Sequence, residues 1–70
     1  MTKDQLENWF TYHPPKEGQP EKYEELRAAG KAFAETIVDL TPPSADQSAA
    51  IRKVREAVYS ANASIACGGK

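Results

Sequence analysis

Apolar and small residues recur at alternating steps of three and four along two long stretches of the chain, a spacing typical of one face of an α-helix. In the first stretch these positions are Tyr23, Leu26, Gly30, Phe33, Ile37 and Leu40. In the second stretch they are Ile51, Val54, Val58, Ala61 and Ile65. No stretch shows the period-two alternation that would indicate a strand. The pattern predicts two helices, over residues 20–40 and 45–66.

A shorter helix is predicted before these two, at the N-terminal end, over residues 3–11. Thr2 and Gln5 have the spacing of a capping box, in which the two side chains bond backbone N–H groups at a helix start. Pro14 and Pro15 then prevent the helix from continuing, because proline lacks the amide proton and disfavours a helical residue before it.

Proline also separates the two long helices. Pro20 suits the first position of a helix, and the Pro42–Pro43 pair breaks the chain before Ser44, which with Gln47 has the spacing of a second capping box. Two apolar faces of the same period on either side of a short turn predict an antiparallel helical hairpin. The expected fold is all-α: one domain over residues 1–70, with a short helix before a long hairpin.

The small size of the chain favours self-association. With 70 residues the core is marginal, and such chains usually need a disulfide, a metal or a partner. The single Cys67 and the single His13 supply neither an internal disulfide nor the four ligands of a structural zinc site. The third helix is rich in alanine, which allows close helix approach but buries little area. We therefore expect a homo-oligomer, without a metal or a cofactor.

The charge balance argues against several classes of partner. Nine basic and ten acidic residues give a net charge of −1, whereas proteins that coat DNA or RNA are strongly basic. No apolar run approaches the roughly 20 residues that span a bilayer, and the polar N-terminus lacks a signal segment. These features predict a soluble intracellular protein that binds neither nucleic acid nor membrane.

Aromatic residues gather in a Trp-Phe-Thr-Tyr-His-Pro-Pro run at residues 9–15, which includes Trp9, Tyr12 and His13. One interpretation is that the rings anchor the first helix to a small core. The other is that a rigid corner of rings binds a planar ligand such as a nucleobase. Residue types alone leave both interpretations open.

Basic side chains follow on both long helices. Arg27 and Lys31 lie one turn apart, and Arg27 is near enough to the proline turn that it could approach Tyr12, which would combine a ring for a base with a cation for a phosphate. On the third helix a polar stripe shares one face: Arg52, Arg55, Tyr59 and Asn62. A solvated face or salt bridges between subunits would explain the same residues.

Several segments of the chain resemble the small helical-hairpin proteins of bacteriophages that act as sponges against the CBASS and Thoeris defences. The segments are residues 9–15, 23–27, 30–31, 50–58 and 61–66, so that the resemblance extends over nearly the whole chain. Members of this family bind the cyclic nucleotide signals that infected bacteria make and keep them from the effectors. The resemblance implies a homo-oligomer of hairpins, typically a hexamer, in the cytoplasm of the infected bacterial host.

The resemblance also implies roles for individual residues. Cyclic dinucleotides such as cGAMP would lie between subunits, with Tyr12 stacked on a base and Arg27 on a phosphate. Arg27 stands where the best-known members have a lysine, which replaces a point charge with a bidentate fork. The predicted ligand-binding set is Tyr12, Arg27, His13, Lys31 and Trp9.

Some members of the family bind cyclic trinucleotides at a separate pocket, and cyclic ADP-ribose isomers are a further ligand class. The candidate for a second ligand site in this chain is the stripe of Arg52, Arg55 and Asn62. No catalytic constellation is evident, so that the expected mechanism is sequestration without degradation. The main alternative is a helical oligomeric adaptor that binds a protein partner, and a nucleic-acid-binding or enzymatic role is a further one.

Overall fold

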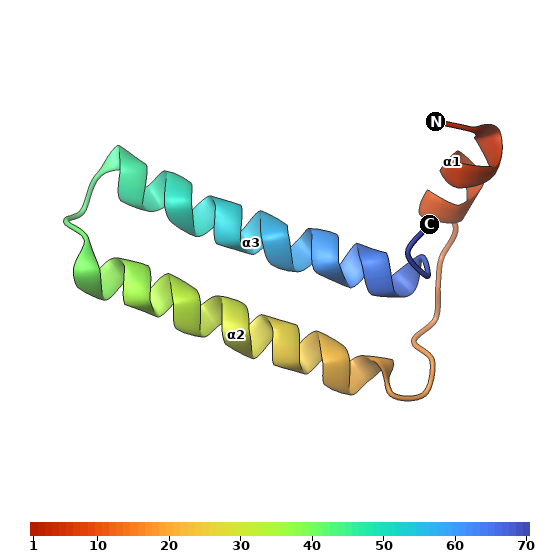
Figure 1. Ribbon diagram of the computed structural model, residues 1–70, viewed down its shortest axis with the longest axis horizontal. Helices are drawn as coiled ribbons and strands as arrows, with labels where there is room; N and C mark the ends of the chain where they lie inside the picture. The colour runs from red at the N-terminus through yellow and green to blue at the C-terminus, as the bar shows by residue number, and fades with distance from the viewer.

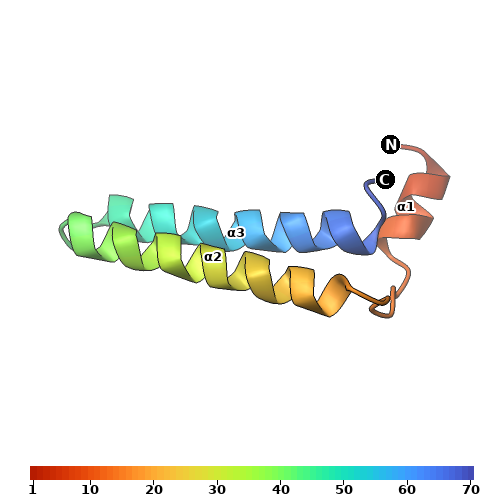
Figure 2. The ribbon, with the colours of Figure 1, turned by 60° about the horizontal axis from the view of Figure 1, so that its bottom comes forward.

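The protein is a helical hairpin with a short helix beside its open end, and the linker after that helix crosses the end (Figure 1). The computed structural model describes residues 1–70 and contains three helices and no strand: α1 (Lys3–Trp9), α2 (Gln19–Leu40) and α3 (Ala45–Ala66). Helices α2 and α3 lie side by side and antiparallel, and both chain termini lie at the end that carries α1 (Figure 2). The predicted all-α hairpin is confirmed.

The start of α1 follows the predicted capping box, but its end does not follow the prediction. Gln5 N donates to Thr2 Oγ1 (3.1 Å) and Thr2 N donates to Gln5 Oε1 (2.7 Å). The helix ends at Trp9, two residues before the expected Thr11. The Thr11 hydroxyl donates to the Glu7 carbonyl (2.5 Å), the oxygen that the backbone N–H of Thr11 would use in a continued helix.

The two long helices begin in different ways. Helix α2 follows Gly18, whose φ of 82° is left-handed, and Pro20 is its second residue, where no N–H partner is needed. At the start of α3, Ser44 Oγ accepts from Gln47 N (3.1 Å). The predicted second capping box is only half formed, because Gln47 Nε2 donates to the Thr41 carbonyl (3.1 Å) and thereby closes the turn between the helices.

The contact between α2 and α3 differs from the predicted heptad at two positions. On α3 all five predicted apolar positions are half-buried, from Ile51 to Ile65. On α2 the half-buried residue after Gly30 is Ala34, whereas Phe33 and Leu40 are 59% and 79% exposed. A single partner helix covers a narrow stripe, and these two large side chains lie outside it.

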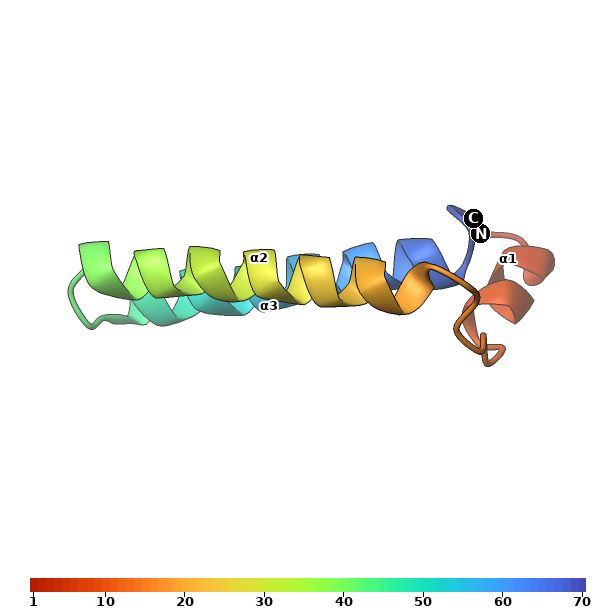
Figure 3. The ribbon, with the colours of Figure 1, turned by 90° about the horizontal axis from the view of Figure 1, so that it is seen from below.

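The hairpin is open and has no buried core. Its extents are 44 × 28 × 14 Å, so that the two long helices form one thin layer (Figure 3). None of the 70 residues is fully buried. The accessible surface is 5763 Å², whereas a compact monomer of this mass would expose about 4,300 Å². The radius of gyration is 15.1 Å, against about 11 Å for a compact chain of this length.

Candidate functional site

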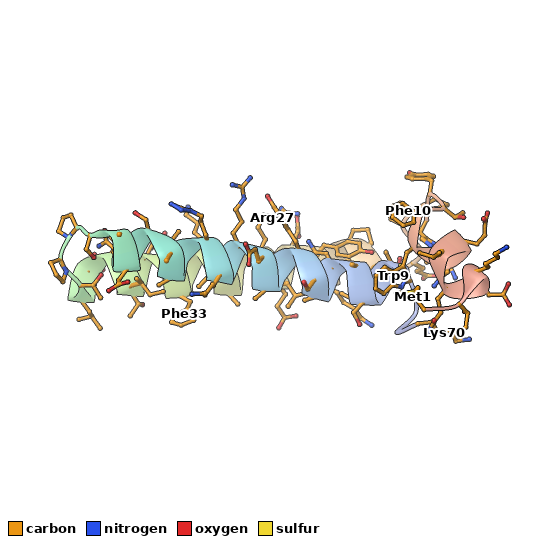
Figure 4. The ribbon with its side chains drawn as sticks, turned by 90° about the horizontal axis from the view of Figure 1, so that it is seen from above. Met1, Trp9, Phe10, Arg27, Phe33 and Lys70 are labelled. Atoms are coloured by element: carbon orange, nitrogen blue, oxygen red, sulfur yellow. The ribbon has the colours of Figure 1, made fainter.

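The two broad faces of the hairpin differ in chemistry. One carries an apolar groove of about 620 Å³, formed by Leu26, Ala29, Gly30, Phe33, Ile37, Ala50, Lys53, Val54, Ala57, Val58 and Ala61. The other carries a basic groove of about 230 Å³, formed by Arg27, Gly30, Lys31, Ala34, Ile51, Val54, Arg55, Val58 and Tyr59. Figure 4 shows Phe33 and Arg27 on opposite sides of the layer. One face is therefore suited to apolar packing and the other to an anion.

The basic groove takes its polar side chains from both helices. Arg27 and Lys31 belong to α2, and Arg55 and Tyr59 belong to α3. Its remaining lining residues are small or aliphatic. Antiparallel packing produces this arrangement, because residues at nearly equal distances from the turn at residues 41–44 face one another across the hairpin. Arg27 thus lies at the level of Tyr59, and Lys31 at the level of Arg55.

Arg55 and Tyr59 form a fixed pair in this groove. Arg55 Nε donates to Tyr59 Oη (2.7 Å), and the guanidinium carbon lies 5.3 Å from the centroid of the tyrosine ring. Both interactions hold the guanidinium plane against α3. The terminal nitrogens of Arg55 have no hydrogen-bond partner, so that the end of the fork is free to bind an anion.

Carboxylates do little to neutralise the groove. The one ion pair of the chain joins Lys31 Nζ to Glu35 at 3.9 Å, with both side chains mostly exposed to water. An exposed pair at this distance contributes little free energy. Arg27 and Arg55 have no carboxylate within 4.0 Å. The groove therefore has an excess of positive charge on a protein whose net charge is −1.

The aromatic run at residues 9–15, here called the aromatic corner, is held at the open end of the hairpin by polar contacts to the C-terminal residues. Trp9 Nε1 donates to the Lys70 carbonyl (3.3 Å), and Asn8 Nδ2 donates to the Cys67 carbonyl (3.2 Å). His13 Nε2 donates to the Asn8 carbonyl (2.7 Å), which folds the chain back after α1. The polar edges of Trp9 and His13 are thus already engaged within the chain.

Tyr12 differs from its neighbours in this corner. Its side chain is 80% exposed and makes no hydrogen bond within the chain. The basic groove that contains Arg27 does not include Tyr12. Arg27 lies part of the way along the two long helices, whereas Trp9 and Phe10 lie at the end of the hairpin (Figure 4). The predicted contact between Arg27 and the aromatic corner is therefore absent from the basic groove of a single chain.

The residues predicted for a second ligand site are only partly together. Arg55 lines the basic groove, whereas Arg52 and Asn62 do not. Arg52 is exposed on α3. Asn62 is half-buried, and its Oδ1 is shielded from water without a hydrogen-bond partner. The stripe follows one face of α3. In the groove, however, Arg55 lies with Arg27 and Lys31, the cations of α2.

Tyr59 is a groove residue that the predicted ligand-binding set omits. A signal for it exists in the sequence, because the proline turn fixes the level at which the two helices face each other. Counting outward from that turn brings Tyr59 to Arg27 and Arg55 to Lys31. The i, i+4 spacing of Arg55 and Tyr59 further favours their contact.

Comparisons with known proteins agree with the fold. The family described as the Acb2/Tad1 hairpin domain matches residues 2–66, which include all three helices. No curated protein and no solved structure gives a significant match to the chain. No group of three or more His, Cys, Asp or Glu residues comes together as a metal site, and no helix has the length and apolar character to span a membrane. The chain therefore belongs to the Acb2/Tad1 hairpin-domain family, the anti-CBASS and anti-Thoeris sponges.

Proposed function

We propose that this protein is a phage-encoded sponge that binds cyclic oligonucleotide immune signals and holds them without degrading them. The observation that carries the proposal is the family match over residues 2–66. The signals would be cyclic dinucleotides such as cGAMP, with cyclic trinucleotides and cyclic ADP-ribose isomers as further candidates. Their removal would block CBASS or Thoeris defence in the cytoplasm of the infected bacterial host, and no catalytic step is needed.

The positive charge of the basic groove is suited to an anionic ligand. A cyclic dinucleotide carries two phosphodiester groups and two bases. Arg27 and Lys31 supply cations for the phosphates, and the exposed ring of Tyr12 is available to stack on a base. Trp9 and His13 would shape the corner that presents Tyr12, because their polar edges bind the Lys70 and Asn8 carbonyls.

Assembly is part of the proposal, because one chain does not bring all of these groups together. Tyr12 lies outside the groove of its own Arg27, so that a ligand that contacts both would lie between two subunits. The surface of each chain exceeds that of a compact monomer by about 1,400 Å². A standard interface hides about 800 Å² per partner. The excess is larger than one such interface and somewhat smaller than the two that a chain in a hexameric ring would form.

The apolar groove supplies a surface for that assembly. Phe33 is 59% exposed there and is surrounded by small side chains such as Ala29 and Ala57. Alanine permits close approach, and a neighbouring subunit could bury the phenyl ring. The stripe of Arg52, Arg55 and Asn62 stays a prediction for a second ligand.

An adaptor that binds a protein partner is the second candidate, and the same apolar groove favours it. A foreign amphipathic helix could occupy the groove in place of another subunit. An adaptor, however, needs neither the exposed ring of Tyr12 nor uncompensated guanidinium groups on the opposite face.

The test is a binding and recovery experiment. The purified protein is mixed with a panel of cyclic di- and trinucleotides and cyclic ADP-ribose isomers, and the bound ligand is recovered after proteolysis of the protein. Recovery of intact ligand supports the sponge. A degraded product would indicate an enzyme, and the absence of binding to every member of the panel would reject the proposal.

A further inference from the structure

We infer that Arg55 binds the phosphodiester groups of the same cyclic dinucleotide as Arg27, and that Tyr59 positions the Arg55 guanidinium for this contact. The inference rests on the proposed function and deepens it. It assigns Arg55 to the basic groove instead of to a separate site along α3. The ligand is thereby held by both helices of one hairpin, with the bases left to groups outside the groove.

The first support is the placement of cations on opposite walls. Arg27 and Lys31 stand on α2 and Arg55 stands on α3, with Gly30 and Val58 in the same groove. Packed helices lie about 8–10 Å apart. An anion between the walls can therefore be contacted from both sides, which a stripe along one helix cannot do.

The second support is the charge balance. Arg27 and Arg55 have no carboxylate within 4.0 Å, and the Glu35 contact of Lys31 is long and exposed. Cations that face one groove repel each other unless an anion lies between them. The two phosphodiester groups of a cyclic dinucleotide carry two negative charges. These would balance the two positive charges of Arg27 and Arg55.

The third support is the geometry of the Arg55 side chain. Its Nε donates to Tyr59 Oη at 2.7 Å. This bond occupies the side of the fork nearest the chain and leaves the N–H groups of the two terminal nitrogens. Those groups form the end of the guanidinium that binds two phosphate oxygens at once. The tyrosine fixes the plane before a ligand arrives, so that less conformational entropy is lost on binding.

The experiment measures cGAMP affinity by calorimetry, at low and at high salt, for the full chain and four variants. Arg27→Gln and Arg55→Gln each remove one cation from the groove. Tyr59→Phe keeps the ring and removes the oxygen that accepts from Arg55. Lys22→Gln is the control, since it removes an exposed cation of α2 that lies outside the groove. Sedimentation records the mass of each assembly.

Arg55→Gln is expected to weaken binding by about tenfold or more, which is the typical effect of losing a hydrogen bond to a charged group. It should also reduce the salt dependence of binding, because one ionic contact is lost. Tyr59→Phe should weaken binding less and leave the salt dependence unchanged. Lys22→Gln should match the unmodified protein in both respects.

Two results would overturn the inference and leave the proposed function intact. One is binding that Arg27→Gln weakens and Arg55→Gln does not. The other is an Arg55→Gln assembly of altered mass, which would make Arg55 a contact between subunits. If the unmodified protein binds no cyclic nucleotide of any class, the proposed function itself fails and the inference falls with it.

Discussion

Gly30 of α2 faces Val58 of α3 so closely that a Cβ atom on the glycine would lie 2.5 Å from Val58 Cγ2. Real side chains do not approach to this distance, so that any other residue at this position would require Val58 or one of the helices to shift. A glycine within a helix costs about 1 kcal/mol relative to alanine. The glycine lies in the middle of the contact between α2 and α3. The apolar and basic grooves share Gly30, Val54 and Val58 at this point.

Gly30→Ala is expected to lower the thermal unfolding midpoint although alanine is the better helix former. The added methyl group must displace Val58, whose branched side chain has few rotamers. Overpacking of this kind costs about 1–3 kcal/mol, which over most of that range is more than the roughly 1 kcal/mol gained in helix propensity. Thermal unfolding followed by circular dichroism measures the balance.

The double variant Gly30→Ala/Val58→Ala is the matched control for this prediction. It removes the atom that the new methyl group would strike, and it should recover part of the lost stability. A single Gly30→Ala variant that unfolds at a higher temperature than the unmodified protein would mean that the helices separate without cost.

The sequence predicts the hairpin because local rules and the apolar pattern agree there. Prolines bound the helices, the capping side chains of Thr2 and Ser44 start two of them, and the three–four spacing identifies one face of each. It misplaces Phe33 for a physical reason. Positions three and four residues after Gly30 border the same stripe, and spacing alone does not separate Phe33 from Ala34. The structure separates them, because Ala34 is half-buried whereas Phe33 is 59% exposed.

The candidate site is harder to predict than the fold, since its residues are distant in sequence. Arg27 and Arg55 come together only through the level at which α2 faces α3, which the periodicity of either helix does not contain. The role of Tyr12 is hard to predict from the sequence for a different reason. Its exposed ring is a property of the tertiary structure, and the proposed contact with a base would need a second subunit, which the sequence of one chain does not place.

Asn8→Ala is expected to loosen α1 from the open end of the hairpin. The variant removes the bond from Asn8 Nδ2 to the Cys67 carbonyl, one of the few contacts that join α1 to the end of α3. A hydrogen bond of this kind contributes about 0.5–1.5 kcal/mol, enough to populate an undocked state of a short helix. Hydrogen exchange of residues 3–9 should become faster, and the fluorescence of Trp9, the only tryptophan, should shift to the red.

Lys3→Ala is the control for Asn8→Ala, because Lys3 is an exposed residue of the same helix without a contact to the C-terminal residues. It should leave both signals unchanged. If Asn8→Ala also leaves them unchanged, the bond from Trp9 Nε1 to the Lys70 carbonyl is enough to hold α1 at the end of the hairpin.

Phe33→Glu is expected to dissociate the proposed assembly into single hairpins. The variant places a charge in a groove whose lining residues are apolar or small except for Lys53, and burial of that charge against another subunit would remove it from water. Sedimentation should show a mass close to the 7.7 kDa of one chain. Val38→Glu is the matched control, because Val38 is about as exposed as Phe33 but lies outside the groove. Dissociation by both variants would mean that the apolar groove is not the specific interface.

Asn62→Leu is expected to raise the unfolding midpoint of the ligand-free protein by several degrees. Asn62 Oδ1 is shielded from water and unpaired, and an unsatisfied acceptor costs about 1–3 kcal/mol. In a domain of this size about 1 kcal/mol shifts the midpoint by roughly 4–8 °C. A midpoint that stays the same or falls would contradict this prediction.

Tyr12→Ala is expected to weaken cyclic dinucleotide binding by about tenfold to a hundredfold, since stacking of one base on an aromatic ring contributes about 1–3 kcal/mol. Tyr12→Phe keeps the ring and should bind nearly as well as the unmodified protein. Neither variant should change the mass of the assembly, because the Tyr12 side chain is 80% exposed and makes no hydrogen bond within the chain. A smaller assembly for Tyr12→Ala would make the ring a contact between subunits, and the loss of binding would then follow from the loss of assembly.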